Sequence, residues 1–368
     1  MPYAPILVSS LLSGFTMPLI IFFAQKRGLY DDNSARKIHK GKIPRLGGVG
    51  IFWAFALVMV FLPFLIDAEL SRTMRERLPM LVPIIAGALI MHLTGLVDDL
   101  SGGRVRAIPK LICQCVAALV VVVSGYWFKG LGFHADIFSG PLTWLSIIIS
   151  IGWIVGISNA LNLIDGMDGL APGISFIVVL VYGAFYQLIG DRGNSFICLA
   201  LAGAIVGFLF VNFPAPSAKL FMGDSGSLFI GYALAVIPFL GQTTGSEPRL
   251  QIGLLPAIVL LAVPMIDTLC AIWRRLRAHV SITTADRLHI HHKFLDHGYS
   301  PIQILFIIYL LTIFQGATFL IVRVLPDTHA FMAEILCLSV IGIFFRYGFS
   351  LKPQTKSNET AINRENSE

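Results

Sequence analysis

Residues 141–170 read PLTWLSIIISIGWIVGISNALNLIDGMDGL, and this stretch determines how the chain folds. Its first part is almost wholly apolar and long enough to cross a bilayer as a helix, which takes about 20 residues. Asn162, Asp165 and Asp168 then recur at every third position, so they lie along one side of a helix end. Glycines beside them let the backbone turn or approach a ligand. Carboxylates at the rim of a membrane are costly unless they bind something, so the stretch predicts a membrane helix that ends in a binding site.

The composition of the whole chain is typical of an integral membrane protein. Hydrophobic residues make up 56% of its 368 residues, charged residues only 13%, and the mean hydropathy is +0.79. Such a chain cannot cover itself with a polar surface, so a soluble protein is excluded. The net charge of +6 suggests anionic headgroups or phosphate ligands as partners. The five cysteines all lie in apolar runs, which argues against a disulfide framework or a cysteine metal site.

Apolar runs of spanning length recur along the chain and predict an all-α polytopic membrane protein of about 11 (10–11) transmembrane helices. The runs fall near 3–24, 46–66, 80–97, 107–126, 141–161, 171–189, 194–213, 226–240, 252–272, 302–322 and 330–350. Lys26 and Arg27 follow the first run, which is therefore expected to be an uncleaved anchor with its N-terminus outside. Most Lys and Arg then lie on the cytoplasmic face, in agreement with the positive-inside rule, and the C-terminus is cytoplasmic.

This topology places every unusual polar cluster on the cytoplasmic face. Asp98 and Asp99 directly follow an apolar span, and Asp224 lies in the loop KLFMGDSGS. Together with Asp165 and Asp168 they would repel one another unless a cation relieves the charge. Carboxylate oxygens favour Mg²⁺, with Mn²⁺ as an alternative. A single aspartate could merely cap a helix or pair with an arginine, but five on one face favour a divalent ion.

A basic and histidine-rich loop follows the ninth apolar run. It contains Arg287, His289, His291 and His292. A structural zinc site would need four assembled ligands, and no cysteine lies nearby. Contact of imidazole and guanidinium groups with phosphate fits better. A basic loop lying on anionic headgroups is the alternative.

Two further features have open interpretations. Phe221 stands three residues before Asp224, where an aromatic ring could stack on a nucleobase or simply pack in the core. Lys40, Lys42 and Arg45 could hold a phosphate or only mark the inner face of the membrane.

These clusters fit two classes of protein. One is a membrane enzyme that joins a phosphate-bearing lipid to a soluble phosphorylated substrate with Mg²⁺. The other is an ion-coupled transporter, whose sites usually lie near the bilayer midplane in repeated halves. The acids here gather at one face and no repeat is present, so the enzyme is favoured. Residues 1–350 are then expected to form a single integral-membrane catalytic domain, and 351–368 a disordered cytoplasmic tail.

Six motifs together resemble a known family, the polyprenyl-phosphate N-acetylhexosamine-1-phosphate transferases. In chain order they are KGKIPRLGG, GLVDD, NALNLIDGMDGL, KLFMGDSGS, PMIDT with RRLR, and DRLHIHH. The last motif resembles the form found in bacterial undecaprenyl-phosphate GlcNAc-1-phosphate transferases rather than the triple-His form of the phospho-MurNAc-pentapeptide translocases. The resemblance implies transfer of a HexNAc-1-phosphate from a UDP-sugar to undecaprenyl phosphate, with release of UMP and a requirement for Mg²⁺. Such enzymes begin surface polysaccharides such as O-antigen at the bacterial inner membrane.

The resemblance also implies roles for individual residues. The expected catalytic residues are Asp98, Asp99, Asp165, Asp168 and His291. The expected substrate-binding residues are Lys40, Asn162, Asn212, Phe221, Arg287, His289 and His292. Asp224 resembles the family's Mg²⁺ ligand, with Asp98 as a second candidate, and Phe221 the aromatic that stacks on uracil.

One departure from the family pattern concerns the paired aspartates. Many members carry a third acid shortly after the pair, whereas Leu100, Ser101 and Gly102 follow here. Arg104, Arg106 and Lys110 therefore have no assigned role. The sugar is also open, because users of GalNAc, QuiNAc and FucNAc share these motifs with users of GlcNAc. The expected partners are the UDP-sugar, undecaprenyl phosphate and membrane lipid, with a homodimer allowed and no nucleic acid.

Overall fold

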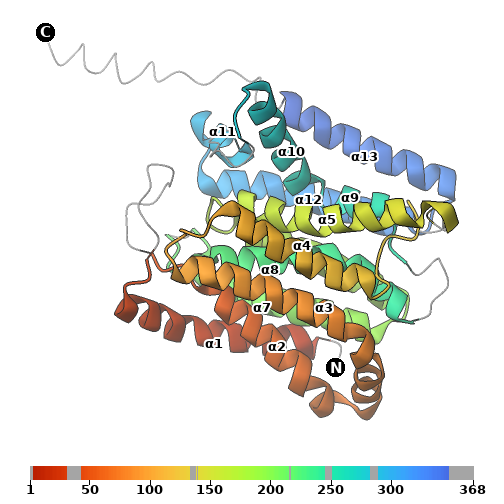
Figure 1. Ribbon diagram of the computed structural model, residues 1–368, viewed down its shortest axis with the longest axis horizontal. Helices are drawn as coiled ribbons and strands as arrows, with labels where there is room; N and C mark the ends of the chain where they lie inside the picture. Colours follow the sequence, from red (N-terminus) through yellow and green to blue (C-terminus); the bar gives the residue numbers. More distant parts are fainter. Residues whose placement is uncertain are drawn as a thin grey trace, which may run out of the picture.

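A computed structural model describes residues 3–30, 43–132, 138, 140–214, 217–244, 251–281 and 289–347 (Figure 1). Within these ranges the regular secondary structure is helical, apart from an isolated bridge between Tyr30 and Pro44. Lys40, Arg287 and the predicted tail 351–368 lie outside the described residues. The prediction of an all-α fold is confirmed for the part of the chain that is described.

The helices follow the predicted apolar runs closely. In chain order they are α1 (Ala4–Arg27), α2 (Gly47–Ile66), α3 (Ala68–Leu100), α4 (Ala107–Val123), α5 (Thr143–Ile164), α6 (Leu170–Leu188), α7 (Arg192–Asn212), α8 (Gly223–Val236), α9 (Leu254–Leu260), α10 (Ala262–Arg277), α11 (Ile290–Asp296), α12 (Pro301–Val322) and α13 (Asp327–Tyr347), with 3₁₀ turns at Gly140–Leu142 and Ile237–Thr244.

The ninth predicted run, 252–272, is not one straight helix. It divides into α9 and α10, which are bent by 84° at Leu261. Pro264 explains the break, because it lacks an N–H and its ring clashes with the carbonyl of Leu260, four residues earlier. Among the described residues nine helices are long and apolar enough to cross a membrane, or ten if the bent pair counts as one span. The polytopic architecture is confirmed, while the number of crossings and their sidedness stay predictions.

Capping side chains set the start of several helices. Asp67 accepts a hydrogen bond of 2.6 Å from the Leu70 amide and starts α3, so this helix runs for 33 residues and begins well before the predicted span at residue 80. Asp191 caps α7 through the Asn194 amide. Ser300 and Gln303 form a reciprocal capping box at the start of α12.

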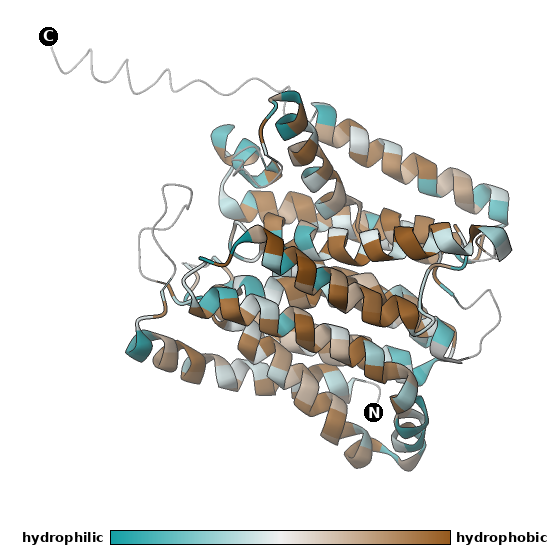
Figure 2. Ribbon diagram, in the orientation of Figure 1, coloured by the Kyte–Doolittle hydropathy of each residue, from teal (hydrophilic) through white to brown (hydrophobic). Residues whose placement is uncertain are grey.

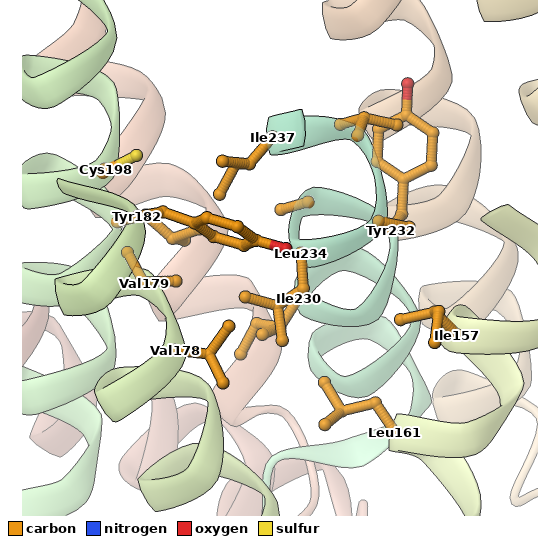
Figure 3. Packing of buried hydrophobic residues seen from close by; sticks show 14 of the residues in the cluster. Ile157, Leu161, Val178, Val179, Tyr182, Cys198, Ile230, Tyr232, Leu234 and Ile237 are labelled. Atoms are coloured by element: carbon orange, nitrogen blue, oxygen red, sulfur yellow. The ribbon is translucent and has the colours of Figure 1, made fainter. Parts of the chain in front are cut away.

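Helix α8 is the centre of the molecule. Every residue from Ser225 to Val236 is buried, and α8 packs against α3, α5 and α2. Figure 3 shows Ile230 and Leu234 of α8 between Val178 and Tyr182 of α6 on one side and the α5 residues Ile157 and Leu161 on the other. In lipid, such packing rather than burial from water holds helices together. The peripheral helices α1 and α13 expose apolar side chains, and Figure 2 shows hydrophobic helix sides with hydrophilic residues toward the ends of the bundle.

The helix directions bring the predicted motifs to one end of this bundle. The last residues of α3, α5 and α7 and the first residues of α8 and α12 all lie toward the left in Figure 1. The short helix α11 lies at the same end. Segments far apart in the sequence therefore meet there.

Candidate active site

The end of α3 and the start of α8 form the base of the candidate site. The two carboxylate oxygens of Asp99 accept hydrogen bonds from the backbone amides of Asp224, at 2.9 Å, and Ser225, at 3.0 Å. These amides belong to the first turn of α8 and have no partner within the helix. Asp99 is 3% exposed, so it acts as a buried clamp on the segment that carries Asp224.

Lys110, near the start of α4, joins the other two carboxylates. Its ammonium group contacts Asp224 Oδ2 directly and lies 3.3 Å from Asp98 Oδ2. The second oxygen of Asp98 accepts a hydrogen bond of 3.0 Å from the Val105 amide. The Asp224 side chain is 25% exposed and that of Asp98 only 6%, so a ligand that enters from the end of the bundle meets Asp224 first.

The described part of the first predicted motif, residues 43–48, packs against the fourth motif, KLFMGDSGS. The Phe221 amide donates to the Pro44 carbonyl at 2.8 Å, and the amides of Gly47 and Gly48 donate to the carbonyls of Phe221 and Met222 at 2.9 and 2.8 Å. Phe221 is half-buried at this junction. The two motifs thus form one rigid loop pair beside Asp224.

Arg45, from the same motif, lies over the end of α3. Its guanidinium donates to the backbone carbonyls of Asp98 and Asp99, at 3.2 and 3.3 Å. It lies 4.0 Å from the Asp99 carboxylate as well. Arg45 therefore stabilises the C-terminal end of a helix, where a cation is favourable.

The end of α5 supplies the next polar groups. Asn162 donates to the Ser227 hydroxyl at 2.8 Å and lies within hydrogen-bonding reach of the Asp224 carboxylate. Asp165 ends α5 and is half-buried, and Asp168 is buried in the turn that follows. Of the predicted cluster, Asn162 therefore lies next to the candidate metal ligand, while Asp165 and Asp168 lie beyond the last turn of α5, in the connection to α6.

Two side chains hold the turn between α5 and α6. Asn212 accepts from the Gly169 amide at 2.8 Å and donates to the Leu220 carbonyl at 3.0 Å. Tyr309 donates to the Gly169 carbonyl at 2.6 Å. Because its amide oxygen and nitrogen both bind backbone, the geometry of Asn212 favours bracing of the site, and its predicted contact with substrate stays a prediction.

The histidine motif approaches the same turn from α11. His291 is 1% exposed, and a side-chain carbon added at Gly166 would lie 2.7 Å from its Nε2. Neither ring nitrogen of His291 has a hydrogen-bond partner in the described part of the chain. Burial, reinforced by the neighbouring His292, lowers the pKa of His291 to about 3. At neutral pH this ring is therefore uncharged, and both of its nitrogens are buried without a partner in the described part of the chain.

The carboxylate oxygens of Asp98 and Asp224 that contact Lys110 are suitable ligands for a divalent cation. Among the described residues no group of three or more His, Cys, Asp or Glu is arranged to hold a metal. Mg²⁺, however, commonly takes only one or two protein carboxylates and completes its shell with substrate phosphates and water. Asp98 and Asp224 already share one cationic group, the Lys110 ammonium, which indicates that both can reach a single cation.

The sequence is related to known membrane transferases along most of its length. Residues 81–242 match the model of glycosyl transferase family 4. A probable undecaprenyl-phosphate N-acetylglucosaminyl 1-phosphate transferase of Bacillus subtilis is 31% identical over 92% of this chain and 89% of its own. The chain belongs to glycosyl transferase family 4.

Two further relatives of this family 4 glycosyl transferase have similar names. A decaprenyl-phosphate N-acetylglucosaminephosphotransferase of Mycobacterium tuberculosis H37Rv is 35% identical over 81% of this chain and 79% of its own. An undecaprenyl-phosphate alpha-N-acetylglucosaminyl 1-phosphate transferase of Escherichia coli K12 is 28% identical over 91% and 88%. The predicted family is confirmed, and the chain is an enzyme, a phosphoglycosyltransferase.

The structure of this family 4 enzyme brings most of the predicted residues to one end of the bundle. Their individual roles stay predictions, and those of Lys40 and Arg287 fall outside the described residues. Sequence reasoning missed Lys110 and Asp267. The available signal was the same for both, a charged residue just inside an apolar run, which is unfavourable unless it is paired.

Proposed function

We propose that the protein transfers an N-acetylhexosamine-1-phosphate from a UDP-sugar to undecaprenyl phosphate, with GlcNAc-1-phosphate as the expected group and GalNAc, QuiNAc or FucNAc as the alternative sugars. The products would be undecaprenyl-diphosphate-HexNAc and UMP. The observation that carries this proposal is the convergence of Asp98, Asp224 and Lys110 from three helices at one end of the bundle. The names of the relatives, which specify polyprenyl phosphates and N-acetylglucosamine phosphate, agree with it.

The reaction needs charge neutralisation and alignment more than covalent help. An oxygen of the lipid phosphate attacks the phosphorus next to the sugar, and the bond from that phosphorus to the bridging oxygen breaks, so UMP leaves. The attacking phosphate is already largely ionised at neutral pH, since its second pKa is about 6. No residue is therefore required to remove a proton from it.

The residues near Asp224 then have distinct tasks. Lys110 neutralises charge on the phosphates, and Asn162 and the loop pair around Phe221 orient the donor. His291 of α11, and His289 directly before this helix, would bind phosphate oxygens of the same substrates. Asp98 and Asp224 would hold Mg²⁺, which when bound shields the diphosphate of the donor and stabilises charge on the leaving group.

The enzyme is proposed to act at the cytoplasmic face of a bacterial inner membrane, as the first membrane step of a surface polysaccharide. The clustering of the polar motifs at one end of the bundle supports an active site at one membrane face.

Release of UMP tests the function directly. Membranes containing the protein are supplied with undecaprenyl phosphate, Mg²⁺ and, in separate reactions, UDP-linked GlcNAc, GalNAc, QuiNAc and FucNAc. UMP release with UDP-GlcNAc, dependent on both the lipid and Mg²⁺, is the expected result. Release with none of the donors would refute the proposal, and release with another donor alone would correct the sugar.

A further inference from the structure

Asp267 is a buried carboxylate on α10 that the reaction described above does not use. It is 2% exposed and lies six residues after the break between α9 and α10. A carboxylate placed among membrane helices is unfavourable unless its oxygens are fully engaged. The hydrogen-bond partners of Asp267 therefore indicate its role.

Both oxygens of Asp267 bind the start of the histidine motif. Oδ2 lies 2.7 Å from His289 Nδ1, and Oδ1 accepts a hydrogen bond of 2.8 Å from the Ile290 amide. One carboxylate thus fixes a histidine ring and the first turn of the helix that carries it. The His289 side chain is only 6% exposed, so the ring has little freedom to turn away.

The contact determines where His289 carries its hydrogen. A carboxylate can only accept, so Nδ1 must donate and Nε2 is the nitrogen left for a ligand. A phosphate oxygen is also only an acceptor, and a ring that donates to it from Nε2 while Nδ1 donates to Asp267 is positively charged. Asp267 then balances that charge. His291, two residues away, has no such partner at either ring nitrogen in the described chain.

We propose that Asp267 is a positioning residue that orients His289 and keeps the hydrogen on its Nδ1, so that Nε2 is presented to a phosphate oxygen of the substrates. This inference rests on the proposed function. The interaction connects the bent span to the reaction, because Asp267 of α10 binds the first residues of the histidine motif. Gln315 of α12 steadies the bend itself, since its amide donates to the Val259 carbonyl at 2.9 Å next to the break.

A double-mutant cycle in the full-length protein tests whether Asp267 acts through His289. Asparagine has nearly the same shape as aspartate but can accept only one of the two hydrogen bonds. Asp267→Asn and His289→Gln are each expected to lower kcat/KM by about tenfold to a hundredfold, the usual effect of removing an orienting partner of a functional histidine. Asp267→Asn added to His289→Gln is expected to lower kcat/KM by little more, because the two changes remove one interaction. Independent, multiplying effects, or near-normal activity of Asp267→Asn, would overturn the inference.

Asp191→Asn is the matched control for loss of a buried clamp. Asp191 also binds a backbone amide and is buried, but it lies at the start of α7, at the other end of the bundle. This variant is expected to lose thermal stability while the folded fraction keeps the wild-type kcat/KM. An equal loss of kcat/KM in Asp191→Asn would assign the effect of Asp267→Asn to general destabilisation and overturn the inference.

A spectroscopic measurement separates this inference from the proposed function. In protein labelled with ¹⁵N-histidine, the His289 signal is identified by its absence from His289→Gln. The measurement is made without substrate. In the wild type the neutral ring should carry its hydrogen on Nδ1, and in Asp267→Asn it should carry the hydrogen on Nε2. An unchanged signal in Asp267→Asn refutes the inference, whether or not the wild type releases UMP. Absence of UMP release from the wild type refutes the proposed function instead.

Discussion

Two adjacent aspartates at the end of α3 have different environments. Both oxygens of Asp99 accept from amides of α8, whereas Asp98 has one oxygen on a backbone amide and the other toward Lys110. An asparagine at position 99 would leave one buried amide facing an NH₂ group, which costs about 1–3 kcal/mol. Asp99 therefore stabilises the segment that presents Asp224, and the geometry favours this role over direct chemistry.

The two aspartates predict different effects on stability for two matched variants. Asp99→Asn should lower the thermal unfolding temperature as well as turnover, because α8 loses its clamp. Asp98→Asn should lower turnover at least tenfold with little change in unfolding temperature. Both quantities are measured on the same purified samples. Equal stability losses in the two variants would contradict this division.

Lys110 provides a test of the cation site that does not depend on turnover. Replacing it with Met leaves Asp98 and Asp224 facing each other without a positive charge, and the two carboxylates repel. Lys110→Met should therefore unfold at a lower temperature in EDTA and recover when Mg²⁺ is added. The wild type should gain less from Mg²⁺, since the lysine already balances the acids. Equal gains in the two proteins would place the Mg²⁺ elsewhere.

At the scale of elements, α3 and α8 approach each other at a glycine. A side-chain carbon at Gly95 would overlap the Asp224 carbonyl oxygen, so α3 and the first turn of α8 can touch only if this residue has no side chain. Gly95→Ala should push the two helices apart and lower both turnover and thermal stability. Gly156→Ala on α5 is the control, because nothing lies within 4 Å of the added carbon there. Normal turnover of Gly95→Ala would show that the spacing of these helices is not critical.

The long helices were largely predictable from sequence, because each contains an apolar run, whereas the short polar helix α11 and the charged start of α3 were not. The break at Leu261 was not, although Pro264 within the run 252–272 was a usable signal. The polar motifs were predictable as a group, since they lie at the ends of apolar runs or in the loops between them. Their pairings were not, because Lys110 and Asp224 are 114 residues apart and only the packing of α3, α4 and α8 brings them together.

At the scale of the whole molecule, the residues proposed for the reaction lie at one end of the bundle and a set of ion pairs joins helices at the other. Arg192 bonds to Asp67 at 2.8 Å and to Glu69 at 2.6 Å, and Arg77 bonds to Asp191 at 2.6 Å. These contacts join the start of α3 to the start of α7. These ion pairs therefore stabilise the end of the bundle that lies away from the proposed site.

This separation predicts that Arg77→Met weakens the fold without altering the reaction. Arg77 and Asp191 are 16% and 7% exposed, so the variant leaves a buried carboxylate without its cation, which costs about 3 kcal/mol. Arg72→Met is the control, because the pair of Arg72 with Glu76 is 79% and 65% exposed. Exposed pairs of this kind contribute about 0.2–1 kcal/mol. The unfolding temperature should therefore fall clearly for Arg77→Met and barely for Arg72→Met, while both keep the wild-type kcat/KM below their unfolding temperatures. A changed kcat/KM in Arg77→Met would mean that the two ends of the bundle are coupled.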